Sequence, residues 1–225
     1  GFVGQMLRGK ALDKYGNLLT TLPLGDCWRE RHDTFKWLFD NLMRENGVGH
    51  RTEVMGLFAN LVQQRERLRR ESLRKRQAAV PDFLLEQDPP VRILADVKGV
   101  YCGDARSNHY SGAAQNTQCG AVERRQTKVH TEMHTSARKT DRKYNPLANL
   151  QDGAMGPVQA YLHTFGRVRG LVVGAFGECS TDVHELIRAM SAIGAQRGWR
   201  IMGASSLKDA AAALKRNAVR SIGIE

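Results

Sequence analysis

Two carboxylates and one ammonium group stand in the sequence at a spacing that suits phosphodiester chemistry. Pro81-Asp82 is followed, after thirteen intervening residues, by Asp96-Val97-Lys98. Clustered carboxylates repel each other unless a hard cation lies between them, and Mg²⁺ is typically held by one or two carboxylates, waters and substrate phosphate oxygens. A neighbouring lysine can hold the attacking water or stabilise developing negative charge. These residue types predict a metal-dependent phosphodiesterase site.

The elements around these residues read as two adjacent strands. Alternation over Val91 to Tyr101 indicates a strand that carries Asp96 and Lys98 on the same face as Leu94. A short apolar run, 79–85, precedes it, and the polar, proline-containing segment 86–90 predicts a hairpin loop. Pairing the two strands brings Asp82 beside Asp96. The alternative is an ordinary hairpin with a solvated Asp96–Lys98 pair, but the apolar Leu94 favours a partly covered face.

The charge of the chain favours a polyanionic partner. There are 34 Lys and Arg residues against 23 Asp and Glu, a formal charge of +11, and such an excess attracts nucleic acids independently of their sequence. Two basic runs flank the acidic residues. The nucleic-acid contacts expected in them are Arg69, Arg70, Arg74 and Lys75 before the motif and Arg124, Arg125 and Lys128 after it. Each run alone is also compatible with a solvated helix face.

The pattern P-D followed by D-x-K on the next strand resembles the PD-(D/E)XK nuclease superfamily, also called restriction-endonuclease-like. The resemblance rests on residues 80–98. The one other acid-x-Lys triplet, Asp141-Arg142-Lys143, lies in a polar helical run without a strand. The resemblance implies an α/β fold with an αβββαβ core, in which a central mixed sheet is flanked by helices. It also implies Mg²⁺, with Mn²⁺ as a substitute, held by Asp82 and Asp96 and assisted by Lys98.

Periodicity predicts the other elements of a single domain. Residues 1–48 form a helical N-terminal extension, 50–178 the catalytic core and 179–225 a peripheral helix-strand-helix unit. Helices are expected at Asp33 to Glu45, from Thr52 toward Gln77, at Ala121 to Lys143, at Val158 to Phe165, from Ser180 or Thr181 to Arg197, and from Ser206 onward. Further strands are expected in 103–118, at Arg167 to Phe176 and at Trp199 to Met202, and the aromatic residues Phe35, Trp37 and Phe39 are expected in the core.

Many members of the superfamily add an acidic residue from the helix before the first motif strand. Glu53 is the first candidate for this ligand, although one straight helix from Thr52 to Gln77 would carry it more than about 30 Å from the strand. Glu66 replaces it if the helix does not bend, and Glu45 is the third choice. For the glutamine that some relatives place on a later helix, Gln159 is the candidate, with an ordinary helix-surface position as the alternative.

The cysteine pattern suggests where the protein works. Cys27, Cys102, Cys119 and Cys179 are widely spaced without a C-x-x-C pair, which favours free thiols in a reducing, intracellular compartment. A zinc site drawn from Cys102, His109, Cys119, His130 and His134 is the weaker alternative. No segment has transmembrane length.

The sequence therefore predicts a nuclease, expected to be an endonuclease acting on duplex DNA, as a module of a mobile-element or phage-type protein and with a homodimer as one option. Two other functions remain open: a non-catalytic DNA- or RNA-binding module, and a binder of structured RNA.

Overall fold

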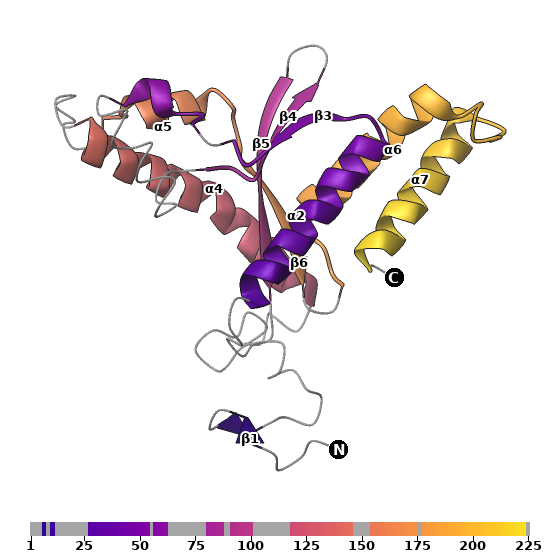
Figure 1. Ribbon diagram of the computed structural model, residues 1–225, viewed down its shortest axis with the longest axis horizontal. Coiled ribbons are helices and arrows are strands. Elements are labelled where there is room, and N and C mark those ends of the chain that lie inside the picture. The colour runs from indigo at the N-terminus through magenta and orange to yellow at the C-terminus, as the bar shows by residue number, and fades with distance from the viewer. Residues whose placement is uncertain are drawn as a thin grey trace.

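The computed structural model describes residues 6–7, 10–11, 27–54, 56–62, 80–87, 91–100, 118–145, 154–174 and 177–223. These residues form an α/β fold in which one mixed sheet of four strands lies between helices (Figure 1). The strands are β3 (Gly49–Thr52), β4 (Phe83–Gln87), β5 (Val91–Val100) and β6 (Arg169–Gly174). A separate pair, β1 (Met6–Leu7) and β2 (Lys10–Ala11), makes a small antiparallel ribbon. The predicted α/β class is confirmed.

The sheet brings the two motifs together. Its strand order is β3-β4-β5-β6. β3 pairs with β4 and β4 with β5 in antiparallel fashion, and β6 is parallel to β5. Phe83 pairs with Ala95, so the residues one step beyond, Asp82 and Asp96, face each other across the two strands. Pro81 lies before the first paired residue of β4, where its missing N–H costs no ladder hydrogen bond.

The two faces of the sheet carry two separate cores. Ala95 and Val97 face a core shared with α2 (Cys27–Glu45), α6 (Thr181–Gly198) and α7 (Leu207–Ile222). Leu84 and Leu94 face a second core, built with α4 (Gln118–Tyr144) and α5 (Pro157–His163). Figure 1 shows these two helical layers on opposite sides of the sheet. The predicted alternation of β5 is confirmed, and Asp96 and Lys98 lie on the α4 side.

The start of the helix expected from Thr52 is wrong, and residues 63–77 of that expected helix lie outside the described residues. Residues 49–52 form β3, and the chain then turns through a short 3-10 helix, η1 (Ala59–Leu61). β3 has four residues, and all but His50 are exposed, so it lacks the apolar alternation that reveals a strand. Pairing with β4 makes it a strand. The third strand expected in 103–118 falls mainly outside the described residues, and Gln118 begins α4.

The strand expected at Trp199 to Met202 is also wrong. α6 runs to Gly198, and the following residues form a turn before α7. The apolar residue that suggested a strand, Ile201, is 90 % exposed, so no sheet covers it. The start of α7 follows the prediction, because Ser206 Oγ accepts a hydrogen bond from the Asp209 N–H at 3.1 Å.

The first helix belongs to the core. α2 begins at Cys27 rather than Asp33 and buries Phe39 and Met43 against the sheet. Phe35 is partly buried there, but Trp37 is 64 % exposed, so the expectation that all three aromatic residues are core residues is wrong for Trp37. The segment expected as an N-terminal extension therefore supplies a helical layer of the sheet.

The second acid-x-Lys triplet has a structural role. Asp141 is fully buried at the end of α4, and its carboxylate accepts the backbone N–H groups of Val158 and Gln159 at 3.0 and 2.9 Å. It also accepts a hydrogen bond from the Asn145 side chain at 2.8 Å. Asp141 thus caps the N-terminus of α5, where orphan donors and the helix dipole favour a negative charge.

We expect Asp141→Ala to destabilise the fold by about 2 kcal/mol, because it leaves buried donors of α5 without an acceptor. Gly156→Ala should weaken the same contact from the opposite side, since a Cβ at Gly156 would lie 2.3 Å from Asp141 Cγ. Urea unfolding of both variants tests this. Wild-type stability in both would contradict the assigned cap.

Candidate metal and phosphodiester site

The centre of the candidate site is a buried pair of aspartates. Asp82 and Asp96 are 9 % and 8 % exposed, and their carboxyl groups hydrogen-bond to each other. Asp82 Oδ2 also accepts the backbone N–H of Val97 at 2.8 Å. Two carboxylates this close repel each other when both are ionised. The repulsion is relieved when a cation binds between them or when one of them retains a proton.

The electrostatics of the pair follow from this geometry. Burial raises the pKa of Asp96 to about 7, with Lys98 opposing the rise and Asp82 adding to it. The pKa of Asp82 is lowered to about 2, because hydrogen bonds from His32, Asp96 and the Val97 N–H outweigh the upward effect of burial. Near neutral pH the metal-free pair therefore holds a negative charge on Asp82 and retains a proton on Asp96 for part of the time.

Lys98 completes the part of the site that the sequence predicted. Its Nζ lies 2.6 Å from Asp96 Oδ2, and the side chain is 29 % exposed. The ammonium group is therefore held by Asp96 and is still accessible to a ligand from solvent. Asp82, Asp96 and Lys98 meet as predicted, on a face partly covered by α4.

A second group of polar residues comes from α2, and the sequence analysis missed it. His32 Nε2 lies 3.2 Å from Asp82 Oδ2, and His32 Nδ1 lies 3.2 Å from Asp33 Oδ1. The hydrogen bond with Asp82 is the main cause that raises the pKa of His32. Lys36, one turn later, places its Nζ 3.6 Å from Asp33 Oδ1. The first turns of α2 thus add a carboxylate and two nitrogen donors to the site.

Glu53 lies at the site in a different way from that expected. Its backbone N–H donates to the Asp82 carbonyl at 2.8 Å, while its carboxylate contacts Lys36 Nζ at 2.5 Å. The backbone φ of Glu53 is 42°, the one positive value among the described non-glycine residues, and such strain often accompanies functional sites. As placed, Glu53 orients Lys36 and does not join Asp82 and Asp96 around a common point.

The two other candidates for the additional acid fare differently. Glu45 ends α2, thirteen residues beyond His32 and about 20 Å away along the helix, so it is excluded as a ligand. Glu66 lies outside the described residues. α2 instead brings Asp33 next to His32, whose ring contacts Asp82.

The expected nucleic-acid contacts are only partly described. Arg124 and Lys128 are exposed on α4, and Arg125 makes a two-pronged ion pair with Glu132 at 2.8 and 2.9 Å. Gln159 is 8 % exposed in the first turn of α5, so its reading as a surface residue is wrong. Arg69, Arg70, Arg74 and Lys75 fall outside the described residues.

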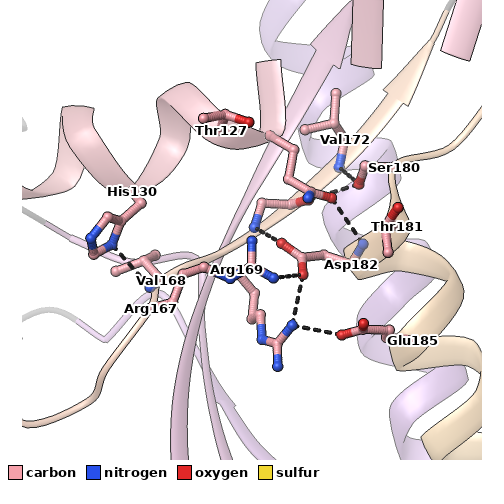
Figure 2. A network of polar contacts seen from close by, with 12 residues as sticks. Thr127, His130, Arg167, Val168, Arg169, Val172, Ser180, Thr181, Asp182 and Glu185 are labelled. Atoms are coloured by element: carbon pink, nitrogen blue, oxygen red, sulfur yellow. Dashed lines mark hydrogen bonds and ion pairs between the residues drawn. The ribbon is translucent and has the colours of Figure 1, made fainter. Parts of the chain in front are cut away.

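A polar network around the buried Asp182 holds β6 beside the site. Gly170 pairs with Asp96 in the sheet, and its N–H donates to Asp182 Oδ2 at 2.8 Å. Figure 2 shows Asp182, at the start of α6, between the guanidinium groups of Arg167 and Arg169. The α4 helix lies so close to Gly170 that a Cβ there would come within 3.0 Å of the Gln126 backbone. This network fixes the strand next to Asp96.

The donor set suits a hard cation better than zinc. In the described part of the chain, no three His, Cys, Asp or Glu side chains are grouped to hold one ion. Two buried carboxylate groups open toward a lysine match the few protein ligands that Mg²⁺ takes, with waters and phosphate oxygens as the rest. Of the residues in the zinc alternative, His130 and His134 do lie together, with ring centroids 4.3 Å apart, but the side chains of Cys102, His109 and Cys119 are not described. Cys179 is a free, buried thiol.

The histidines between α4 and α5 contribute stability that is lost in mild acid. Burial lowers the pKa of His130 and His134, and neighbouring positive groups (Arg167 and His163 for His130; His130, His163 and Arg138 for His134) lower it further. The unfolded chain therefore protonates these histidines at a higher pH than the folded chain does. The stability that the neutral histidines provide above pH 6.5 is lost as the pH falls below 6.5 and through their pKa values in the folded protein.

We expect the contribution of these histidines to the free energy of unfolding to fall between pH 7.5 and about 5.5. His134→Gln should reduce this fall, so the variant should gain stability relative to wild type as the pH is lowered. Urea titrations at the two pH values measure it. His184→Gln, at an exposed position on α6, is the matched control and should leave the fall unchanged. An equal fall in both variants would mean that groups other than His134 cause the pH dependence.

Searches of protein-family models, of curated proteins and of solved structures found no match to this chain. None of the helices in the described part of the chain combines the length and apolar character needed to cross a bilayer.

Proposed function

We propose that the protein is a Mg²⁺-dependent nuclease that hydrolyses phosphodiester bonds in nucleic acid. The observation that carries the proposal is the buried, hydrogen-bonded pair Asp82–Asp96 with Lys98 Nζ 2.6 Å from Asp96. A structural ion pair explains Lys98 and Asp96 alone. It does not explain a second buried carboxylate beside them, which costs stability in the absence of a cation.

Each residue has a distinct part in the proposed reaction. Asp82 and Asp96 would hold Mg²⁺, which on binding would lower the pKa of a coordinated water and neutralise charge on the phosphate. Mn²⁺ takes similar oxygen ligands and should substitute. Lys98 offers an N–H donor to the attacking water or to a phosphoryl oxygen in the transition state. Asp33 contacts His32 and Lys36, and Glu53 contacts Lys36, so neither is proposed as a direct ligand of the metal.

The substrate is proposed to be DNA, expected as a duplex, and the cut to be internal. Two features support a polyanion: the net charge of +11 and the basic, solvent-exposed side of α4 that includes Arg124 and Lys128. An acidic pair alone would repel a phosphodiester, so basic groups near it are required. Cutting both strands would be served by a homodimer, which we include in the proposal.

The chain order of the elements supports the same family of folds. In the described part of the chain, the order is one helix (α2), three antiparallel strands (β3, β4, β5), a helical segment (α4 and α5) and a strand parallel to β5 (β6). This is the αβββαβ order that the resemblance to the PD-(D/E)XK superfamily implies. We propose a restriction-endonuclease-like core on this ground, with α6 and α7 added after β6.

The proposal is tested with labelled duplex DNA, single-stranded DNA and RNA of one sequence, each incubated with Mg²⁺ or with EDTA. We expect Mg²⁺-dependent cleavage, with duplex DNA cut fastest, and no cleavage in EDTA. Lys98→Met retains the length of the side chain without its charge and should lower the rate by about 10²-fold or more. Lys208→Met, at an exposed position on α7, is the matched control.

Two results would point elsewhere. Cleavage that persists equally in EDTA or in Lys98→Met would mean that another site or a contaminant is responsible. Tight binding without cleavage of any of the three substrates would favour a non-catalytic nucleic-acid-binding module, and preference for folded RNA would favour an RNA binder.

A further inference from the structure

We infer that His32 is a positioning residue that fixes the direction of the Asp82 carboxylate for metal binding. The inference rests on the proposed function, because it assigns a role within the same site. It starts from a contact that joins two distant parts of the chain: His32 Nε2 on α2 lies 3.2 Å from Asp82 Oδ2, just before β4.

Two donors converge on one oxygen of Asp82. The Val97 N–H donates to Oδ2 at 2.8 Å, and His32 Nε2 approaches the same atom. Rotation of the carboxylate group would break both hydrogen bonds, so the direction of the second oxygen, Oδ1, is fixed as well. A carboxylate that is held in this way binds a cation without first losing rotational freedom.

His32 is itself held from both sides. Its Nδ1 lies 3.2 Å from Asp33 Oδ1, and its helix is anchored in the core through Phe39 and Met43. The ring can donate from Nε2–H to Asp82 both as the neutral Nε2–H tautomer and as the cation. The positioning role therefore requires no change in the charge of His32. With a carboxylate at each ring nitrogen, His32 has no free nitrogen with which to act as a base on water.

Two substitutions of His32 distinguish the positioning of Asp82 from simple neutralisation of its charge. His32→Gln keeps a side-chain N–H donor of similar reach and removes the ring charge. His32→Leu keeps much of the volume and removes the donor. If hydrogen bonding to Asp82 matters, glutamine should rescue what leucine loses, whereas a charge role predicts that both variants fail.

The test measures Mg²⁺ binding and cleavage separately in wild type, His32→Gln and His32→Leu. Mg²⁺ binding is read from the rise in melting temperature during a Mg²⁺ titration without substrate, and cleavage from the Mg²⁺ concentration that gives half the maximal rate. We expect His32→Leu to require about 10- to 100-fold more Mg²⁺ in both measurements and His32→Gln to stay within about threefold of wild type. His184→Leu, on the exposed side of α6, controls for loss of a histidine.

The outcomes separate the two levels of the proposal. Equal Mg²⁺ requirements in wild type and His32→Leu, or equal losses in both variants, overturn the positioning role and leave the nuclease proposal standing. A wild-type protein that neither responds to Mg²⁺ nor cleaves nucleic acid overturns the nuclease function, and the role of His32 with it.

Discussion

Asp96→Asn should abolish Mg²⁺-dependent cleavage and leave the protein folded. The substitution removes a charged metal ligand from the pair with Asp82, and a loss of several kcal/mol of transition-state stabilisation corresponds to a rate lower by on the order of 10³-fold. Asparagine has nearly the shape of the protonated carboxyl group, and its amide can still donate to Asp82. Cleavage assays and thermal unfolding of the same preparation measure both effects.

The pH dependence gives this variant a second signature. The pKa of Asp96 is raised in the folded protein from 3.8 to about 7, so between these values the unfolded chain releases a proton that the folded chain retains. Folding is therefore opposed increasingly as the pH rises from about 4 to about 7. In EDTA, we expect Asp96→Asn to be at least as stable as wild type at pH 8 and to lack this contribution to the slope.

Glu86→Gln is the matched control for the loss of a carboxylate, because Glu86 is exposed on β4. It should retain cleavage. Marked destabilisation of Asp96→Asn in EDTA at pH 8 would contradict the burial penalty assigned to Asp96, and full activity would remove Asp96 from the site.

Asp182→Ala should have the largest effect on stability among the variants considered. Asp182 is 2 % exposed and accepts hydrogen bonds from the Gly170 N–H and from both Arg167 and Arg169. Its removal leaves the buried Gly170 N–H and the Arg167 guanidinium without this acceptor. Arg169 keeps its contact with Glu185. Because both arginines are partly exposed and can turn to solvent, we expect a loss of about 2 to 4 kcal/mol rather than that of a fully buried pair.

Two related variants show whether this loss comes from the buried acceptor. Asp182→Asn keeps an oxygen for the Gly170 N–H and should lose less than alanine. Glu185→Ala removes only the exposed partner of Arg169 and should cost at most about 1 kcal/mol. Urea unfolding of the three variants gives the comparison, and equal losses in all three would contradict the assigned order.

Residues with a local signal were predictable from the sequence. The alternation over 91–100 identified β5 and the faces of its side chains, and pairing with the neighbouring run placed Asp82 beside Asp96. The same reasoning distinguished Asp96-Val97-Lys98, on a strand, from Asp141-Arg142-Lys143, on a helix. The alternation of side chains along a strand, and the short distance in sequence between the two strands of a hairpin, are enough to predict which residues face each other.

The contribution of α2 was not predictable in the same way. His50 and Arg51 are polar residues on a four-residue edge strand, whose conformation depends on pairing with β4 rather than on its own pattern. Reading Thr52, the last residue of this strand, as the start of a helix shifted the search for the additional acid to Glu53. His32 of α2 was present in the sequence, but its contact with Asp82 depends on packing between segments 50 residues apart.

The central claim is tested most directly by adding Mg²⁺ to a preformed complex of the protein with labelled duplex DNA in EDTA. Wild type should hold the DNA intact until Mg²⁺ is added in excess and then release cut products. Asp96→Asn and Lys98→Met should bind the same DNA and release none. DNA that remains bound and uncut by wild type after Mg²⁺, or Mn²⁺, is added would contradict the assignment of Asp82, Asp96 and Lys98 as a phosphodiesterase site.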